Sequence, residues 1–339
     1  MPHVSVIVVN YNAGDRIERC LKMLTAQSFQ DFEVIIVDNA SSDDSLVTAR
    51  KAAPTAVLIE NSANLGFAAA NNIAASVAAG EWLAFLNPDA YPAPDWLEML
   101  LDATTRFPWA DAFGSTQIDA ADPEVIDGAG DVFHVFGIPY RGHYGWPVSE
   151  LPPEGECFAP CAAAALYRAS VFRALGGFDD SFFCYGEDVD LGFRLRLAGG
   201  RAVQVAGAIV HHEGSGISGR YSEFTVYHGN RNRIWTVWKN MPGVFFWPLL
   251  PLQILTNLYL LARSFSMGVG PAFWRAVRDG YAAFPALAAR RSDIQRARRV
   301  RLADLARALT WSPLKVSRRE ANLRAIPVMD ASGASRRGL

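Results

Sequence analysis

The sequence predicts an α/β fold with a mostly parallel central sheet, and three observations lead to that expectation. Residues 4–9 (VSVIVV) and 33–37 (EVIIV) are short, largely β-branched apolar runs, which are typical of strands buried on both faces. Helical patterns alternate with these runs, as at 15–26, and such alternation favours a parallel sheet. Half of the 339 residues are hydrophobic, which is enough for a substantial core.

The later elements follow the same alternation. We expect further strands at 56–60, 82–86, 161–167, 202–205 and 208–210. We expect further helices at 68–79, 92–107, 169–175 and 227–239, and one that begins after Gly186. Residues 111–160 are less regular and contain several Gly, Pro and aromatic residues, so we interpret them as an insertion that carries a substrate-specific surface.

Polar side chains follow the predicted strands at the points where the strands end. Asn10 and Asn12 come after the first strand, and Asp38, Asn64 and Asp89 come after later ones. Any one of them could be a turn residue, because Asn and Asp favour turns. Their recurrence at the carboxyl edge of a parallel sheet instead predicts a ligand site there.

Two common nucleotide motifs do not occupy this edge. The first strand is not followed by G-x-G-x-x-G, and the chain has no G-x-x-x-x-G-K-[ST]. One G-x-G-x-x-G occurs at 214–219, but no acidic residue stands about twenty positions later. We interpret 214–219 as a flexible lid rather than a dinucleotide loop.

The stretch 182–196 (FFCYGEDVDLGFRLR) places three acids directly after Gly186. Glu187, Asp188 and Asp190 would suit the first turn of a helix, where the macrodipole favours carboxylates. Paired acids beside aromatic residues would equally suit a general base, because burial raises the pKa of one carboxyl while its neighbour stays ionised. Both interpretations are open at this point.

Charge and cysteine content indicate where the chain works. Residues 263–339 hold sixteen Arg or Lys residues and five acidic residues. Residues 1–262 hold sixteen Arg or Lys residues and twenty-nine acidic residues. A basic tail on an acidic body predicts an anionic partner, either a membrane surface or nucleic acid. The acidic body and the apolar stretch at 244–262 together disfavour nucleic acid and favour the membrane surface. The spacing of the four cysteines does not match that of a metal-binding motif, and we expect free thiols in a reducing compartment.

Residues 244–262 form a nineteen-residue apolar stretch interrupted by Pro248, Pro251, Gln253 and Asn257. The length would suffice to span a bilayer. We favour interfacial, monotopic attachment, with a core helix pair and a true span as alternatives. Because we see no signal peptide, we expect a cytoplasmic protein that is peripheral or monotopic at the inner face of the cell membrane.

Six ordered motifs carry a resemblance to a known family. They are VSVIVVNYN, VIIVDNASSDDS, ENSANLGFAAANN, FLNPDA, LGGFDDSFFCYGEDVDLGFRLRLAGG and VHHEGSGISG. Over residues 3–240 the chain resembles inverting family 2 glycosyltransferases of the GT-A fold, and more finely it is similar to bacterial rhamnosyltransferases. The order and spacing of the motifs carry the match, since each motif alone is modest.

The resemblance implies roles for individual residues. Asp188 would be the catalytic base, and Glu187 would support or orient it. Asp89 would bind the metal, Mg²⁺ or Mn²⁺; Asn87 replaces the first acid of the family's D-x-D motif, so His211 would complete the site. Because adjacent strand residues face opposite sides, only one of His211 and His212 is expected to reach it. The donor nucleotide would be held by Asn10, Tyr11, Asn12, Asp38, Asn64, Gly66, Asn71 and Asp89.

The resemblance also implies the reaction and the domain organisation. We expect a catalytic domain at 1–225, a helical, apolar and basic membrane-associating region at 226–330, and a disordered tail at 331–339. A sugar, most simply L-rhamnose from dTDP-rhamnose, would move to a lipid-linked or cell-surface polysaccharide precursor. The alternatives are a UDP-linked hexose or N-acetylhexosamine donor, or a non-catalytic nucleotide-sugar-binding scaffold. A nucleotidyltransferase is disfavoured, because no basic, Gly-rich loop follows the first strand.

Overall fold

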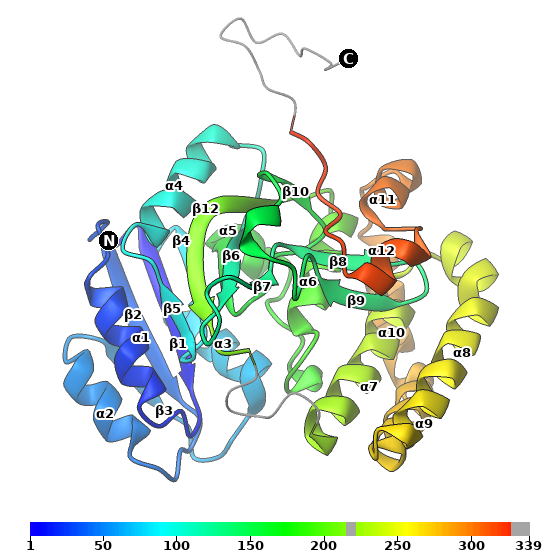
Figure 1. Cartoon of the computed structure of the whole chain (residues 1–339), viewed down its shortest axis with the longest axis horizontal. Coiled ribbons are helices and arrows are strands. Elements are labelled where there is room, and N and C mark those ends of the chain that lie inside the picture. The colour runs from blue at the N-terminus through cyan, green and yellow to red at the C-terminus, as the bar shows by residue number, and fades with distance from the viewer. Residues whose placement is uncertain (215–221, 327–339) are drawn as a thin grey trace, which may run out of the picture.

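A large twisted sheet forms the centre of the molecule in this computed structural model, which describes residues 1–214 and 222–326 (Figure 1). The ten-stranded sheet has the order β10-β12-β6-β11-β4-β1-β2-β3, and β5 and β7 pair with β12 and β6. The strands are β1 (Val4–Asn10), β2 (Phe32–Asp38), β3 (Val57–Glu60), β4 (Trp82–Leu86), β5 (Ala90–Pro92), β6 (Ala112–Asp119), β7 (Ile126–Gly128), β10 (Gly155–Cys157), β11 (Ala164–Arg168) and β12 (Ala202–His212). A separate hairpin joins β8 (Asp131–His134) to β9 (Ile138–Arg141).

Most of the central strands point the same way. β4, β1, β2 and β3 pair in parallel, and so do β6 and β12. β11 lies antiparallel between β4 and β6, so those two neighbours share one direction. The carboxyl ends of six strands therefore meet at one edge of the sheet, as expected for the GT-A arrangement.

Helices cover both faces of the sheet because the side chains of each strand alternate. In β1, Val4, Val6 and Val8 pack with α1, α2 and α4, whereas Ile7 and Val9 pack on the face of α3, α5 and α6. The helices of this part are α1 (Arg16–Thr25), α2 (Ser45–Ala52), α3 (Gly66–Val77), α4 (Trp96–Arg106), α5 (Ala169–Ala174) and α6 (Glu187–Leu197), with short 3₁₀ turns η1 (Val148–Glu150) and η2 (Asp180–Phe182).

The local predictions before residue 111 agree closely with the structure. The four predicted strands have bounds within one residue of β1 to β4. The helix expected at 92–107 begins only at Trp96, because residues 90–92 form β5 against β12. The two short strands expected at 202–205 and 208–210 are one strand, β12, with a register shift between Val205 and Ile209.

The region 111–160 contributes more to the fold than the sequence suggested. β6 lies inside the sheet between β12 and β11, although it carries Ser115, Thr116 and Gln117. All three are buried, and two have partners: the Trp96 indole donates to Ser115 Oγ at 2.8 Å, and Thr116 Oγ1 donates to Ala206 O at 3.1 Å. Buried polar groups with hydrogen-bond partners are compatible with a central strand.

The C-terminal part is helical and packs against the sheet domain. Its helices are α7 (Glu223–Asn240), α8 (Gly243–Ser266), α9 (Gly270–Ala282), α10 (Phe284–Arg296), α11 (Leu302–Ala308) and α12 (Pro313–Arg318). A shared apolar cluster includes Phe133 and Phe158 from the sheet side, Val189 from α6, and Val237 and Leu305 from the helical part. α7 crosses the boundary predicted at 225/226, and the division into domains stays a prediction.

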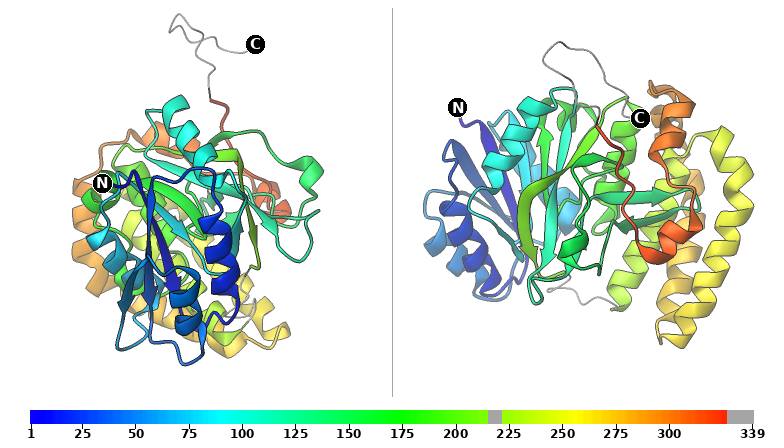
Figure 2. Two further views of the ribbon diagram at one scale, coloured as in Figure 1. Left: turned by 90° about the vertical axis from the view of Figure 1, so that its left-hand side faces the viewer. Right: turned by 45° about the horizontal axis from the view of Figure 1, so that its top comes forward.

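α8 lies at the outer edge of the helical part, on the side away from β3 (Figures 1 and 2). The tail expected at 331–339 and most of the loop at 214–219 lie outside the described residues.

Candidate active site

A pocket of about 520 Å³ opens at the carboxyl edge of the sheet. The loops after β1, β3 and β4 contribute Tyr11, Asn64, Gly66 and Asp89, as the strand-end pattern predicted. The remaining lining residues are Val9, Asn39, Phe67, Asn87, Pro88, Arg141, Phe183, Cys184, Tyr185, His212, Ser222 and Phe224. The pocket therefore combines an apolar, aromatic wall with a few converging polar groups, as ligand sites do.

Asp89 and His212 meet inside this pocket. Asp89 Oδ1 lies 3.5 Å from His212 Nε2, and the two side chains are 6% and 2% exposed. Neither of these atoms has a hydrogen-bond partner, and neither has the buried Asn87 Oδ1. Buried polar atoms are normally paired, so three unpaired ones around a pocket require an explanation.

Those three atoms suit a divalent cation. Carboxylate and amide oxygens are preferred by Mg²⁺ and Mn²⁺, and an imidazole nitrogen completes a mixed donor set. Burial alone would raise the pKa of Asp89, but the nearby His212 imidazole and the charge of Arg141 hold that pKa below its usual range. An ionised Asp89 is the form that a cation would bind.

His212, rather than the predicted His211, faces Asp89. Neighbouring residues of a strand point to opposite faces, and β12 turns the buried His212 inward while His211 is only partly buried. His212 Nδ1 lies 2.7 Å from Asp127 Oδ2, which fixes the orientation of the ring. The geometry thus replaces His211 with His212 as the candidate ligand.

The residues expected to hold the nucleoside divide into two layers. Asn10 and Asp38 are 0% and 2% exposed, and Asn10 Nδ2 donates to Asp38 Oδ1 at 2.7 Å beneath the loops. Asn12 Oδ1 accepts from Ser42 N at 2.7 Å and fixes the loop after β2. Asn71 is also buried and donates to Phe67 O within α3. These four residues do not line the pocket, and their contact with a nucleoside stays a prediction.

Asn39 lines the pocket, although no role was predicted for it. Its Nδ2 donates to Asn64 Oδ1 at 3.0 Å and to Gly66 O at 3.1 Å, while its Oδ1 accepts from Leu65 N at 3.2 Å. It therefore ties the loops after β2 and β3 together. Its place next to Asp38 at the end of a strand was the available signal.

The loop that precedes α6 approaches the pocket in a strained conformation. Phe183 and Tyr185 have φ of 65° and 71°, and Gly186 has φ of 81°. Gly66 accommodates this loop, because a Cβ there would lie 2.5 Å from Phe183 O. Left-handed non-Gly residues cost about 1–3 kcal/mol each and cluster at functional sites.

Asp188 lies in the first turn of α6 with its carboxylate held by backbone donors. Asp188 Oδ2 accepts from Ala162 N at 3.0 Å, and Oδ1 accepts from Val189 N at 2.8 Å. Glu187 is buried, its Oε2 has no hydrogen-bond partner, and burial together with the charge of Asp188 raises its pKa well above the usual range. A neutral Glu187 would suit a supporting acid, and the roles of Glu187 and Asp188 stay predictions.

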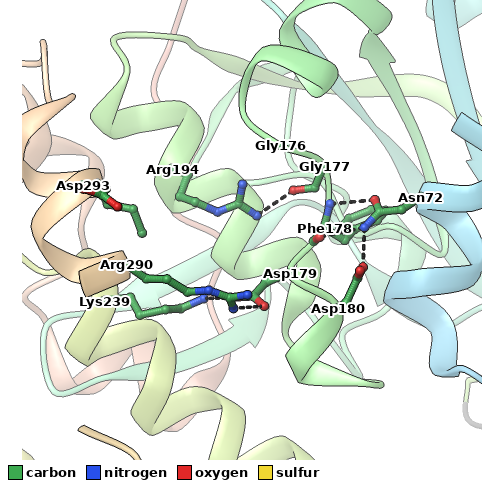
Figure 3. Close-up of a pocket in the computed structure, with 11 residues that line it drawn as sticks. Asn72, Gly176, Gly177, Phe178, Asp179, Asp180, Arg194, Lys239, Arg290 and Asp293 are labelled. Carbon is green, nitrogen blue, oxygen red and sulfur yellow. Dashed lines mark hydrogen bonds and ion pairs between the residues drawn. The ribbon is translucent and has the colours of Figure 1, made fainter. Parts of the chain in front are cut away.

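Asp190 does not face solvent, as a plain helix-start interpretation would have it. It is fully buried, and it pairs with Arg194 Nε at 2.8 Å and Lys239 Nζ at 2.9 Å. Lys239 also reaches Asp179 at 2.6 Å beside a second hollow of about 320 Å³, where Arg290 binds the same carboxylate (Figure 3). The cations in this hollow are already paired, which makes it a structural junction between α6, α7 and α10.

Asp127, Asp131 and Arg141 were missed by the sequence analysis. All three come from the β7–β9 segment, and Arg141 lines the pocket while it pairs with Asp127. Asp131, Cys161 and Asp188 each offer an atom, and these atoms lie within 4.8 Å of one another. In the sequence, the two acids stand among Gly and apolar residues. Acids in such apolar surroundings could have been predicted to be buried.

Comparison with known proteins identifies the family. Residues 5–176 match the family described as Glycosyl transferase family 2. The chain belongs to glycosyl transferase family 2. It is 33% identical over 239 residues to an N-acetylglucosaminyl-diphospho-decaprenol L-rhamnosyltransferase of Mycobacterium tuberculosis, covering 63% of this chain and 77% of the relative. It is also 33% identical over 227 residues to the O-antigen biosynthesis protein RfbC of Myxococcus xanthus, covering 62% of this chain and 17% of that protein.

Solved structures support the fold of this family 2 glycosyltransferase. A mannosyltransferase of Pyrobaculum calidifontis, in complex with GDP-Man and Mn²⁺, aligns with a TM-score of 0.52 and 19% identity over 87% of this chain and 86% of that one. Residues 1–349 of S. aureus TarS align with a TM-score of 0.56 and 18% identity, covering 87% and 89%. These similarities confirm the GT-A-like fold.

Proposed function

We propose that this family 2 glycosyltransferase is an inverting, metal-assisted enzyme that moves a sugar from a nucleotide-diphosphate donor to a lipid-linked or polysaccharide acceptor. The observation that carries the proposal is the buried Asp89–His212 pair, whose facing atoms lack hydrogen-bond partners at the edge of the pocket. Mg²⁺ or Mn²⁺ held by Asp89, His212 and Asn87 would neutralise charge on the leaving diphosphate. A solved relative in fold carries a nucleotide sugar and Mn²⁺, which is consistent with such a site.

The chain's own residues account for the proton and the geometry. Asp188 would accept the proton of the acceptor hydroxyl while that oxygen bonds to the anomeric carbon. The bond from that carbon to the diphosphate oxygen breaks on the opposite face, and the nucleoside diphosphate leaves with the electron pair. Two backbone donors fix the carboxylate of Asp188 in place, as a general base requires.

The donor and the acceptor are proposed from the relatives. The Mycobacterium tuberculosis relative is named for transfer of L-rhamnose to N-acetylglucosaminyl-diphospho-decaprenol. We therefore favour dTDP-rhamnose as the donor and a lipid-linked saccharide as the acceptor for this chain. The aromatic wall of Phe183, Tyr185 and Phe224 offers apolar surface for such a ligand.

Release of nucleoside diphosphate tests this function. Wild-type protein would be assayed with dTDP-rhamnose, UDP-glucose, UDP-galactose and UDP-N-acetylglucosamine, with a membrane lipid extract as acceptor, in Mg²⁺ or Mn²⁺ and in EDTA. We expect metal-dependent release from one donor, and a loss of about 10²–10⁴-fold in Asp188→Asn with donor binding retained. Equal turnover by Asp188→Asn would contradict the base assignment.

Attachment to an anionic membrane at the inner face of the cell membrane is the second part of the proposal. α8 is long and apolar enough to cross a bilayer, and only 17% of its most apolar eighteen-residue stretch is buried. Its polar residues face the protein: Gln253 donates to Val135 O at 3.3 Å, and Asn257 donates to the Tyr281 hydroxyl at 2.8 Å. A spanning helix would lose these bonds, so they favour a helix that lies along the surface.

The outward face of α8 is apolar. Trp247, Leu255, Leu258, Tyr259 and Phe265 are each between 55% and 63% exposed. Exposed apolar residues gathered on one helix mark an interaction surface. The basic excess of residues 263–339 favours anionic lipid as the partner, and nucleotide-sugar donors favour the cytoplasmic side.

A further inference from the structure

Three elements bring an acidic cluster to the start of α6. Asp131 comes from β8, Asp188 comes from the first turn of α6, and Cys161 precedes β11. One ligand-type atom from each lies within 4.8 Å of the others. Asp131 is 6% exposed, whereas Asp188 is only partly buried. Two carboxyl groups therefore share one largely enclosed space.

The surroundings of the two carboxyl groups differ. Backbone N–H groups of Ala162 and Val189 donate to Asp188, and such bonds stabilise a negative charge. Asp131 lies deeper, and burial, followed by the charge of Asp188, raises its pKa well above the usual range. Two neighbouring carboxylates in a buried site cannot both ionise easily, so the proton favours Asp131.

The charged and titratable groups around Asp131 favour a state in which one of the two carboxyl groups, Asp131 or Asp188, is protonated. Arg141 is the cation that faces the cluster among the described residues, and it is already paired with Asp127. Cys161 is a neutral thiol, because burial raises its pKa. The groups that face Asp131 from the packed elements are Asp127 of β7, Arg141 of β9, Cys157 of β10, Cys161, Tyr167 of β11 and Asp188 of α6.

We propose that Asp131 and Asp188 form a carboxyl pair that carries a single proton on Asp131, and that Asp131 is thereby a positioning residue for the base. The neutral Asp131 leaves Asp188 as the carboxylate that accepts the proton of the acceptor hydroxyl. If Asp131 ionised, its charge would compete with that of Asp188 and would repel a donor diphosphate. The inference deepens the proposed function, because it takes Asp188 as the base.

The cluster is a poorer cation site than the pocket. A neutral thiol does not suit Mg²⁺ or Mn²⁺, which prefer oxygen ligands. Asp89, Asn87 and His212 instead present buried atoms without hydrogen-bond partners. The cluster is therefore assigned to proton control rather than to metal binding.

The protonation of Asp131 can be measured without any turnover. Protein labelled with ¹³C-aspartate would be titrated by NMR, and Asp131→Asn would assign the signal. We expect Asp131 to be protonated at pH 7 in the wild type and to titrate at lower pH in Asp188→Asn, because a like charge has been removed. An ionised Asp131 at pH 7, or a titration that Asp188→Asn leaves unchanged, would overturn the proposal.

The pH profile of transfer gives an independent readout. Asp131→Asn keeps a neutral group of the same size at every pH, so the shape of the pH profile, rather than the rate at pH 7, is the readout. The fall in rate at alkaline pH should disappear in Asp131→Asn and persist in Asp111→Asn. Asp111 is the matched control. Burial also raises its pKa, but it directly precedes β6, at the end of that strand away from the carboxyl edge that carries the pocket. An alkaline limb that survives in Asp131→Asn would contradict the proposal.

One further outcome separates the pair from a metal site. Mn²⁺ binding by Asp131→Asn should match the wild type in an equilibrium titration. Loss of Mn²⁺ binding in Asp131→Asn, with binding retained in Asp89→Ala, would place the cation in the cluster and overturn the inference. If no donor of the panel is turned over, the NMR result still decides the protonation of Asp131, so the two proposals fail separately.

Discussion

Lys239 on α7 places its ammonium 2.9 Å from Asp190 Oδ1 on α6, two residues after the proposed base Asp188. Both side chains are nearly inaccessible, at 1% and 0% exposure. Lys239 also contacts Asp179 at 2.6 Å, so one cation joins α7, α6 and the turn before η2. A helix predicted to lie largely outside the catalytic domain thereby fixes the helix that begins at the active site.

Replacing Lys239 should destabilise the protein strongly. Lys239→Met removes the buried cation that Asp179 and Asp190 share and leaves each carboxylate with one arginine partner, Arg290 or Arg194. Breaking one side of a buried pair costs about 3–5 kcal/mol. Chemical unfolding at pH 7 measures the loss. Lys22→Met is the matched control, because the Lys22–Glu18 pair is largely exposed. A midpoint for Lys239→Met equal to that of Lys22→Met would contradict a stabilising role for the junction.

The same pair should make stability depend on acid pH. The nearby cation lowers the pKa of Asp190, against the effect of burial, and the pKa of Asp179 is lowered in the same way. Groups with depressed folded pKa values contribute stability above their unfolded pKa, about 3.9, and lose it as pH falls through the folded value. The difference between wild type and Lys239→Met should therefore shrink below about pH 4. A constant difference from pH 7 to pH 3 would argue against this linkage.

Asn232 should control the shape of the loop before α6. Its side-chain amide donates to Phe182 O at 3.0 Å, Cys184 O at 2.9 Å and Tyr185 O at 2.7 Å. These bonds hold a loop that contains two left-handed non-Gly residues. Asn232→Ala should lower kcat more than it changes donor affinity, and it should lower the stability by about 2–4 kcal/mol. Asn230→Ala, which loses one bond within α7, is the control. Unchanged kcat in Asn232→Ala would show that the loop before α6 keeps its conformation without the hydrogen bonds of Asn232.

The two adjacent histidines should behave differently. His212→Ala removes the atom that faces Asp89, so metal-dependent donor binding should weaken by at least tenfold. His211→Ala is the matched control at the next position of β12, and its donor affinity should stay near the wild-type value. Titration of Mn²⁺ and nucleotide against each variant measures both. The reverse order of effects would restore His211 as the ligand.

Asp127 should tune the metal site without touching the metal. It pairs with His212 Nδ1 and with Arg141, so it orients the imidazole. Partners of this kind typically change metal affinity by 10–100-fold when they are removed. We expect Asp127→Asn to weaken Mn²⁺ binding within about that range while excess Mn²⁺ restores much of the turnover. If saturating Mn²⁺ did not restore turnover, Asp127 would have a role beyond orienting the imidazole of His212.

The sequence predicted the parts of the site that local signals encode. Short apolar runs, β-branched in β1 and β2, located β1 to β4 and hence the pocket residues Tyr11, Asn64 and Asp89. The choice between His211 and His212 was not predictable from position alone, because the register shift near Val205 changes which face a later residue of β12 presents.

The segment from β6 to β9 was harder to predict for a different reason. Its stability comes from partners far away in the sequence, as in the pairing of Asp127 with His212 across 85 positions. No local pattern marks such contacts. The acids of this segment therefore looked like surface residues of an insertion, although two of them, Asp127 and Asp131, are buried beside the site.

The apolar face of α8 should bind anionic vesicles, and charge placed on it should abolish binding. Leu255 and Leu258 are 60% and 55% exposed, and burying one such side chain contributes about 1.5–3 kcal/mol. Leu255→Asp with Leu258→Asp should lower partitioning into phosphatidylglycerol vesicles by at least tenfold in a flotation assay. Val77→Asp, on the exposed side of α3 at 55%, is the matched control and should float like the wild type.

Two outcomes would contradict membrane docking by α8. One is flotation of the double variant equal to that of the wild type. The other is a wild-type dimer in sedimentation that the double variant loses, with no binding to vesicles, since the face would then be covered by a second copy of the chain. Binding should also weaken as salt rises, because the basic residues of the C-terminal helices act through screened charge.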